Sequence, residues 1–137
     1  MADSISQSQA TIALLDDNPA SSGLIAAWLH RLGLGPCLTW KDPYEGLRTL
    51  MIEAQNGKQP RIVICRSAMR TCSAVDVIHT LRRIPGWSQI PILILREHED
   101  VSEKSDHNSQ HALLEAGATE FLEWPTTESD LLRALSR

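Results

Sequence analysis

The sequence predicts an α/β protein built on a single doubly wound, five-stranded parallel sheet with helices on both faces. Short apolar runs recur along the chain and are continuous rather than alternating, as expected of strands that are covered on both faces. Segments with helical periodicity separate these runs, so that strand and helix alternate five times. The chain has 137 residues, 42% of them apolar and 22% charged, which fits one domain with its own core.

The five predicted strands differ in how apolar they are. The run at 120–123 is the weakest of the four apolar runs, and the fifth strand, 37–40, is short and more polar than the others. We therefore place 37–40 near an edge of the sheet. The predicted strands are 11–15, 37–40, 62–65, 91–95 and 120–123.

The predicted helices have recognisable ends and apolar stripes. Pro19 and Pro43 stand near first turns, and Thr127 with Asp130 forms a plausible capping box. The first helix carries apolar residues at spacings of three and four, so we interpret its Trp28 as part of the core. The predicted helices are 20–32, 44–55, 74–84, 109–116 and 128–135.

Composition excludes several classes of function. No apolar stretch approaches the ~20 residues that span a bilayer, and the first ten residues lack the basic and apolar regions of a signal peptide. We therefore expect a cytoplasmic protein without membrane contact, with 1–10 as a disordered extension and 11–137 as the domain. A formal charge of −4 argues against direct binding of nucleic acid.

The cysteines give no sign of a metal site or of a disulfide framework. Cys37, Cys65 and Cys72 lack metal-ligand spacing, and their number is odd. Histidine and acidic residues, which can also bind metals, lie in the long polar stretch 97–111. There, His107 and His111 have helical spacing, but a solvated loop is the commoner explanation. We predict no metal and no cofactor.

The carboxyl ends of the strands are where a doubly wound sheet binds its ligands. Asp16 and Asp17 follow the first strand, and adjacent carboxylates there suit a divalent cation or a positive partner. Taken alone the pair is a weak signal, because aspartate is also common at helix N-caps. No glycine-rich phosphate loop follows this strand, which argues against dinucleotide and P-loop sites.

Four segments together resemble the receiver domains of bacterial response regulators. They are Leu-Leu-Asp-Asp-Asn-Pro at 14–19, Pro-Arg-Ile-Val-Ile-Cys-Arg-Ser-Ala-Met at 60–69, Ile-Pro-Ile-Leu-Ile-Leu-Arg-Glu at 90–97 and Glu-Ala-Gly-Ala-Thr-Glu-Phe-Leu-Glu-Trp-Pro at 115–125. They occur in the order seen in that family, and the resemblance covers about residues 11–137. It implies the flavodoxin-like receiver fold.

The resemblance also implies a degenerate phosphorylation site. Family members are phosphorylated on an aspartate at the end of the third strand, aided by magnesium on the acidic pair, a threonine or serine after the fourth strand, and a lysine before the final proline. Asp16 and Asp17 match the acidic pair. Arg66 stands at the phosphoacceptor, Arg96 at the threonine or serine, and Trp124 at the lysine.

These substitutions remove the family's chemistry. A guanidinium is always protonated and has no lone pair for attack on phosphorus, so Arg66 cannot replace the nucleophile. It also places a positive charge where magnesium would need a ligand. We expect Arg66, with Arg96 as a further candidate, to form bidentate pairs with Asp16 and Asp17 that neutralise the site. Trp124 is a candidate to stack on one of the guanidinium groups.

We therefore predict a pseudo-receiver, not an enzyme: a phosphorylation-independent interaction module in bacterial signal transduction. Its partner would be a signalling protein or an effector domain, with a homodimer as a further form of contact. The alternative is a ligand-sensing domain of the same fold that binds a small anion between Arg66 and Arg96. An ordinary surface ion pair without function is the simplest reading of Arg66. The resemblance places the contact face on the fourth helix, fifth strand and fifth helix, with Leu113, Leu114, Glu120, Glu123, Leu131 and Arg133.

Overall fold

The computed structural model describes residues 11–97 and 110–136. Its core is one five-stranded sheet in the order β2-β1-β3-β4-β5, with every neighbouring pair of strands parallel. The predicted fold class is therefore confirmed. The strands are β1 (Ile12–Leu15), β2 (Cys37–Trp40), β3 (Ile62–Arg66), β4 (Ile92–Glu97) and β5 (Glu120–Trp124).

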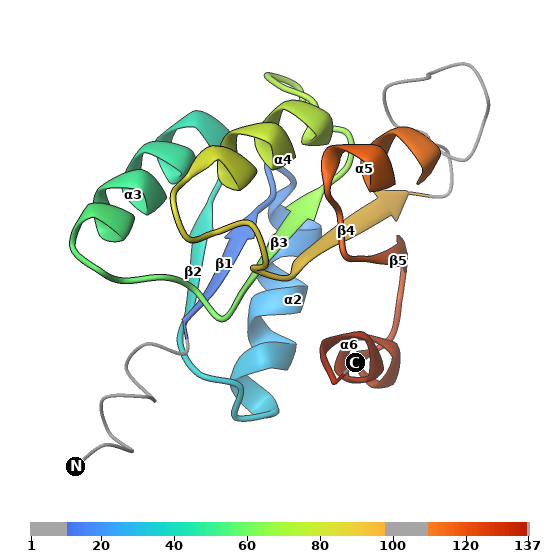
Figure 1. The fold of residues 1–137 in the computed structure, drawn as a ribbon. Helices are drawn as coiled ribbons and strands as arrows, with labels where there is room; N and C mark the ends of the chain where they lie inside the picture. The colour runs from blue at the N-terminus through green and yellow to red at the C-terminus, as the bar shows by residue number, and fades with distance from the viewer. Residues whose placement is uncertain (1–10, 98–109, 137) are drawn as a thin grey trace, which may run out of the picture.

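Two layers of helices cover the sheet. Figure 1 shows α3, α4 and α5 over one face and α2 and α6 over the other. The described helices are α2 (Pro19–Arg31), α3 (Pro43–Gln55), α4 (Ala74–Arg83), α5 (Gln110–Ala116) and α6 (Glu128–Leu135). Each predicted helix is present with its ends displaced by one residue at most. The longest are 13 residues, and no described helix is long and apolar enough to cross a membrane.

Each face of the sheet has its own buried cluster, because side chains alternate along a strand. One cluster, which includes Val63 and Ile94, packs under α3, α4 and α5. The other, which includes Ile64 and Leu95, packs against α2 and α6. The central strands β1 and β3 are buried along their whole length, which explains their continuous apolar sequences.

The predicted edge position of 37–40 is also confirmed. Strand β2 pairs with β1 on one side only, and Leu38 exposes 46% of its surface. The lower apolar content of this strand agrees with its position at the edge, where Leu38 and Thr39 are exposed.

The helix ends agree with the sequence signals. Asn18 and Asp42 cap α2 and α3 through their side chains and are followed directly by Pro19 and Pro43. At α6, the Asp130 amide donates to Thr127 Oγ1 at 3.1 Å. Because α2 begins at the carboxyl end of β1, its cap places Asp16 and Asp17 between the end of a central strand and the first turn of a helix.

Candidate functional site

Arg66 is the last residue of β3, and its side chain lies in the crevice at the carboxyl edge of the sheet. The residue exposes 9% of its surface. Its Nη1 donates to Ser21 Oγ at 3.3 Å, and its Nε donates to the Ala68 carbonyl at 3.2 Å. The guanidinium is therefore held between the first turn of α2 and the loop that follows β3.

Three carboxylates surround this guanidinium. Arg66 Nη1 lies 3.8 Å from Asp16 Oδ1, Arg66 Nε lies 4.0 Å from Asp17 Oδ1, and Arg66 Nη2 contacts Glu97 Oε1. We call Asp16, Asp17, Ser21, Arg66 and Glu97 the Arg66 cluster. The predicted ion pairing of Arg66 with the acidic pair is present. The predicted bidentate hydrogen bonds to that pair are wrong, because both distances exceed hydrogen-bond range.

Hydrogen bonds hold both members of the acidic pair. The fully buried Asp16 accepts from Ser21 Oγ at 2.5 Å and from the Asn18 amide at 2.9 Å. Asp17 Oδ2 accepts from the Arg70 amide at 2.8 Å. The two carboxylates thus order the start of α2 and the loop after β3, and Arg66 adds a charge between them.

One guanidinium does not neutralise both carboxylates of the acidic pair. Arg66 lies within ion-pairing distance of Asp16 and of Asp17. No other cation among residues 11–97 and 110–136 forms an ion pair with Asp16 or Asp17. The prediction of a self-neutralised site is therefore wrong. These carboxylates still do not converge on one point, since no described group of three potential ligands could hold a metal ion.

Arg96 lies on the other face of the sheet. Arg66 pairs in register with Leu95, whose side chain belongs to the cluster under α2 and α6. Arg96 is the next residue and therefore points the opposite way. Its Cζ lies 5.9 Å from the centre of the Phe121 ring, and Phe121 packs against the cluster under α3, α4 and α5.

The structure consequently does not bring Arg66 and Arg96 together, and the prediction that Arg96 shares the acidic pair is wrong. Arg96 exposes 8% of its surface, and its buried Nε has no hydrogen-bond partner among residues 11–97 and 110–136. A buried guanidinium nitrogen of this kind is unusual, because buried polar atoms are nearly always bonded.

Within the part of the chain that the structure describes, the Trp124 ring lies against another tryptophan and not against an arginine. Its ring centre lies 6.3 Å from that of Trp28 in α2, with the planes tilted by 46°. The guess that Trp124 stacks on a guanidinium is therefore wrong, and the cation-π contact of this region is that of Arg96 with Phe121. The tryptophan pair joins the end of β5 to α2.

The thiols near the site are protonated at neutral pH. Cys65 is fully buried, and burial is the main cause that raises its pKa above the ordinary value of 9.0. Burial, with a smaller effect from Asp76, raises the pKa of Cys72 to about 11. Because the thiolate is the reactive form, neither cysteine is an activated nucleophile.

Two members of the predicted contact face belong to the core. Leu113 and Leu131 are fully buried, so their assignment to a contact surface is wrong. Leu114 is 49% exposed, and Glu123 and Arg133 are exposed as well. The sequence could not separate these positions, because all the leucines in α5 and α6 are equally apolar and only packing decides which of them face solvent.

The polar stretch that offered a metal site falls mostly outside the described residues. His107 lies in 98–109, and the first ten residues, predicted to be disordered, lie outside as well. His111 is described, and its Nε2 lies 3.3 Å from Glu115 Oε2 one turn along α5.

Glu97 and Ser21 are the members of the site that the sequence did not identify. Glu97 faces the same side of the sheet as Leu95 and Arg66. Because side chains alternate along a strand, Glu97 could have been predicted once Arg66 was known to pair with Leu95. Ser21 stands in the first turn of α2, five residues after Asp16. Serine is so common near helix starts that its position alone carried no signal.

No protein-family model and no curated protein matches the sequence, but the fold has many solved counterparts. A receiver domain protein from Clostridium thermocellum is 29% identical, with a TM-score of 0.74 over 93% of this chain and 91% of that chain. The chemotaxis protein CheY4 of Vibrio cholerae is 23% identical, with a TM-score of 0.76 over 93% and 97%.

A third counterpart is the receiver domain of the sensor histidine kinase PA1611 from Pseudomonas aeruginosa, solved with magnesium in its active-site cleft. It is 20% identical to this chain, with a TM-score of 0.73 over 93% of this chain and 94% of that chain.

Proposed function

The chain has the fold of response-regulator receiver domains, which supports a role in signal transduction, and we propose that it is a pseudo-receiver that signals without phosphorylation. The observation that carries this proposal is the position of Arg66. It ends β3 at the carboxyl edge of the sheet and contacts Asp16, Asp17 and Glu97. This is a place where a receiver would need a carboxylate nucleophile, and a guanidinium cannot attack phosphorus.

The chemical part of the proposal is tested with a phosphodonor. The full chain is incubated with acetyl phosphate and magnesium, and the intact mass is measured, with an active receiver as positive control. We expect no added phosphoryl group. A phosphorylated species whose modification maps to any residue of the Arg66 cluster would contradict the proposal.

Arg66 also supplies the proposed mechanism, which is to hold the crevice in one conformation. It links the ends of β3, β1 and β4 to α2, through ion pairs and through its hydrogen bond to Ser21. Relatives change the charge of this crevice when they are phosphorylated, whereas here a fixed charge occupies it. The chain would then present one constant surface to its partner, acting as a binding module and not as a catalyst.

Hydrogen exchange tests the conformational part. In Arg66→Met, which keeps the length of the side chain and removes its charge, we expect faster exchange of amides in 16–22 and 66–74. The control is Arg48→Met, because Arg48 is an exposed arginine of α3 outside the cluster. Equal amide exchange rates in the two variants would show that Arg66 does not restrict the conformation of these segments.

For the contact surface we propose the outer side of α5, β5 and α6, with the exposed residues Leu114, Glu123 and Arg133 and the half-buried Glu120, to which the structure adds the exposed Leu132. Leu114 and Leu132 expose 49% and 40% of their surfaces, and an apolar centre with a polar rim is the usual composition of an interface. The partner would be a signalling protein, an effector domain or a second copy of the chain.

Sedimentation and pull-down distinguish these partners. Leu114→Ser and Leu132→Ser are compared with Leu24→Ser, an equally exposed leucine (43%) on α2. Loss of dimers, or of a partner recovered from the source cells, in the first two variants and not in the third supports this face. Equal recovery by all three variants would exclude it.

A second candidate function is the sensing of a small anion, which we proposed from the sequence for Arg66 and Arg96 together. Arg66 is engaged and faces away from Arg96, so the remaining support is the unpartnered Nε of Arg96. Titration with phosphate, followed through the Arg96 Nε–H signal in NMR spectra, tests this function. A saturable shift that Arg96→Gln abolishes supports it, and an unchanged spectrum excludes it.

A further inference from the structure

The outer edge of β2 presents backbone groups that the sheet itself does not use. On the inner edge, the Ile12 amide of β1 donates to the Pro36 carbonyl at 2.9 Å. Backbone groups that point toward the neighbouring strand alternate along β2 with groups that point away from it. The amides and carbonyls of Cys37 and Thr39 therefore point outward, and within the described part of the chain they have no backbone partner.

Strand β2 itself lacks the features that protect exposed edges. Natural proteins guard such edges with charged residues, prolines or bulges, whereas the four residues of β2 are Cys-Leu-Thr-Trp. Leu38 exposes 46% of its surface, and Thr39 is exposed as well. Figure 1 shows β2 at one side of the sheet, next to β1. The edge is therefore open to another strand.

We propose that two copies of the chain pair antiparallel through β2, about a two-fold axis at Leu38. In this register Cys37 of each copy lies opposite Thr39 of the other, and residues opposite each other at such positions exchange two hydrogen bonds. Every outward amide and carbonyl of the two strands is then bonded. The two Leu38 side chains meet at the axis.

The register that satisfies the backbone also suits the side chains. Leu38 lines a hollow of about 300 Å³ together with Trp40 and Leu50, on the side of the sheet that α3 covers. Directly opposite side chains in an antiparallel pair have Cβ atoms roughly 4.5 to 5.5 Å apart. The Leu38 side chain of the second copy would therefore cover this exposed leucine at the mouth of the hollow.

The charges at the two ends of the strand also favour a second copy as the partner. Lys58 and Glu53 line the hollow beside Leu38, and Lys41 and Asp42 follow β2 in the sequence. The two-fold axis brings the end of each strand to the start of the other. Because each end carries one charge of each sign, the two copies meet without net repulsion between like charges.

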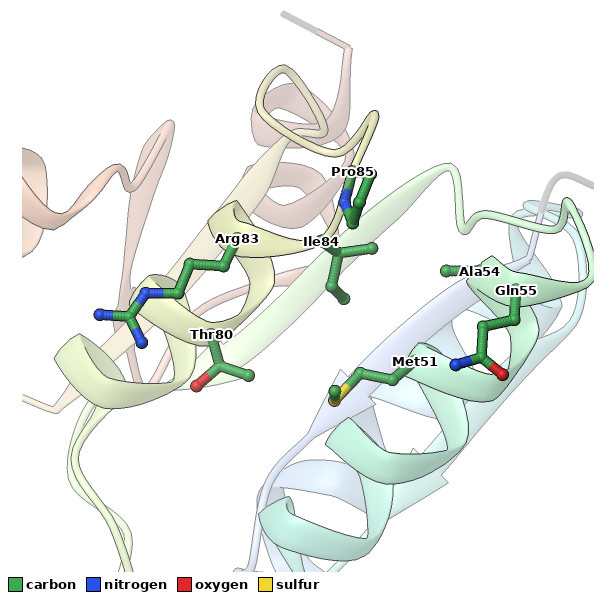
Figure 2. Close-up of a pocket in the computed structure, with 7 residues that line it drawn as sticks. All are labelled: Met51, Ala54, Gln55, Thr80, Arg83, Ile84 and Pro85. Atoms are coloured by element: carbon green, nitrogen blue, oxygen red, sulfur yellow. The ribbon is translucent and has the colours of Figure 1, made fainter.

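This surface is separate from the other surfaces of the molecule. The contact surface proposed on α5, β5 and α6 lies at the opposite edge of the sheet, and the hollow between α3 and α4 in Figure 2 includes no residue of β2. The dimer is therefore independent of the pseudo-receiver proposal. Because only one short strand of each copy takes part, we expect a weak dimer, with a Kd of roughly 10 to 100 μM.

Opposite charges placed at the axis test the dimer. The full chain is studied by sedimentation equilibrium from about 10 μM to about 1 mM, a range set by the expected Kd. Leu38→Lys and Leu38→Glu should each weaken dimerisation at least about tenfold, because like charges would then face each other. An equimolar mixture of the two variants should form a heterodimer. Leu24→Lys is the control, since Leu24 of α2 is similarly exposed (43%), and it should dimerise as the parent chain does.

Cross-linking tests the register. In a Cys37→Ser background, Leu38→Cys should form a disulfide between two copies under mild oxidation, because the Cα atoms at the axis would be about 4.5 Å apart. Leu24→Cys in the same background should not cross-link.

Four results would overturn the proposal. They are a chain that stays monomeric over the whole range, a dimer that the Leu38 variants do not weaken, a mixture of those variants that stays monomeric, and a dimer that Leu114→Ser dissociates. Protection of the Thr39 amide from hydrogen exchange only after another protein is added would also overturn it, because that protein would then cover the edge.

Discussion

The Nη1 of Arg66 lies 3.8 Å from Oδ1 of Asp16, and the two side chains expose 10% and 0% of their surfaces. Because both charged groups are buried, each is compensated by the other and not by water. A buried pair of charges contributes little net stability over an apolar pair, but removal of one partner leaves the other uncompensated. The site is therefore more sensitive to the loss of one charge than to the loss of both.

Arg66→Met should lower the free energy of unfolding by about 3 kcal/mol, because Asp16 remains buried without its counter-charge. Urea denaturation measures this change. The double variant Arg66→Met with Asp16→Asn should recover part of the loss, since the amide needs no counter-ion. If the loss of unfolding free energy in the double variant equals the sum of the losses in the two single variants, the two charges do not interact.

Arg66→Asp should convert the crevice into a site for a divalent cation. The variant places a fourth carboxylate beside Asp16, Asp17 and Glu97, so it should be less stable than the parent chain in the absence of metal. Magnesium should raise the melting temperature of this variant and leave that of the parent unchanged. Arg66→Asn, which adds no charge, is the control. A magnesium effect of equal size on all three proteins would contradict the prediction.

Gly46→Ala should destabilise the protein, although alanine favours a helix more than glycine does. A methyl group at this position of α3 would overlap Leu15 Cδ2 and lie 3.1 Å from Trp40 Cγ. We expect a loss of about 1 to 3 kcal/mol, typical of an overpacked core. Gly23→Ala in α2 is the matched control, because nothing lies within 4 Å of the added methyl group, and it should gain up to about 1 kcal/mol.

The buried Cys65 should make stability fall as the solution becomes alkaline. Its pKa in the folded protein is raised by burial above the ordinary value of 9.0. Below pH 9 both states hold the proton and the stabilisation is fully present. As the pH rises above 9, the unfolded chain releases the proton first. The free energy of unfolding therefore falls by up to about 1.4 kcal/mol per pH unit.

Lysine and tyrosine also titrate at alkaline pH, so the parent chain is compared with Cys65→Ala. The difference between the two slopes of unfolding free energy against pH is the contribution of Cys65. We expect a shallower decline in the variant when unfolding free energies are measured between pH 8 and 10.5, a window set at about the ordinary thiol pKa. Parallel curves would mean that Cys65 ionises equally in the folded and unfolded states.

The fold could be predicted from the sequence because its signals are local and redundant. Continuous apolar strands, proline at helix starts and the capping residue Thr127 all indicate the same alternation. The pairing of Arg66 with the acidic residues was also predictable, since the carboxyl ends of adjacent parallel strands meet at one edge. The face on which each side chain lies was harder to predict, because a shift of one residue reverses it.

That difficulty explains the incorrect predictions at the site. Arg96 and Glu97 are neighbours in the sequence, yet only Glu97 reaches Arg66, because the side chain of Arg96 crosses to the Phe121 side. Trp124 was placed at the right strand end but turns toward Trp28. Assignment of these side chains requires the register between β3, β4 and β5, which no single segment of the sequence contains.

The placement of Arg66 and Arg96 on opposite sides of the sheet has a genetic consequence. Residues that share no contact usually contribute additively to stability, so a substitution at one of these positions needs no compensating change at the other. Each arginine can be replaced in turn, by selection or by an engineer, and its effect can be measured on an otherwise unchanged background.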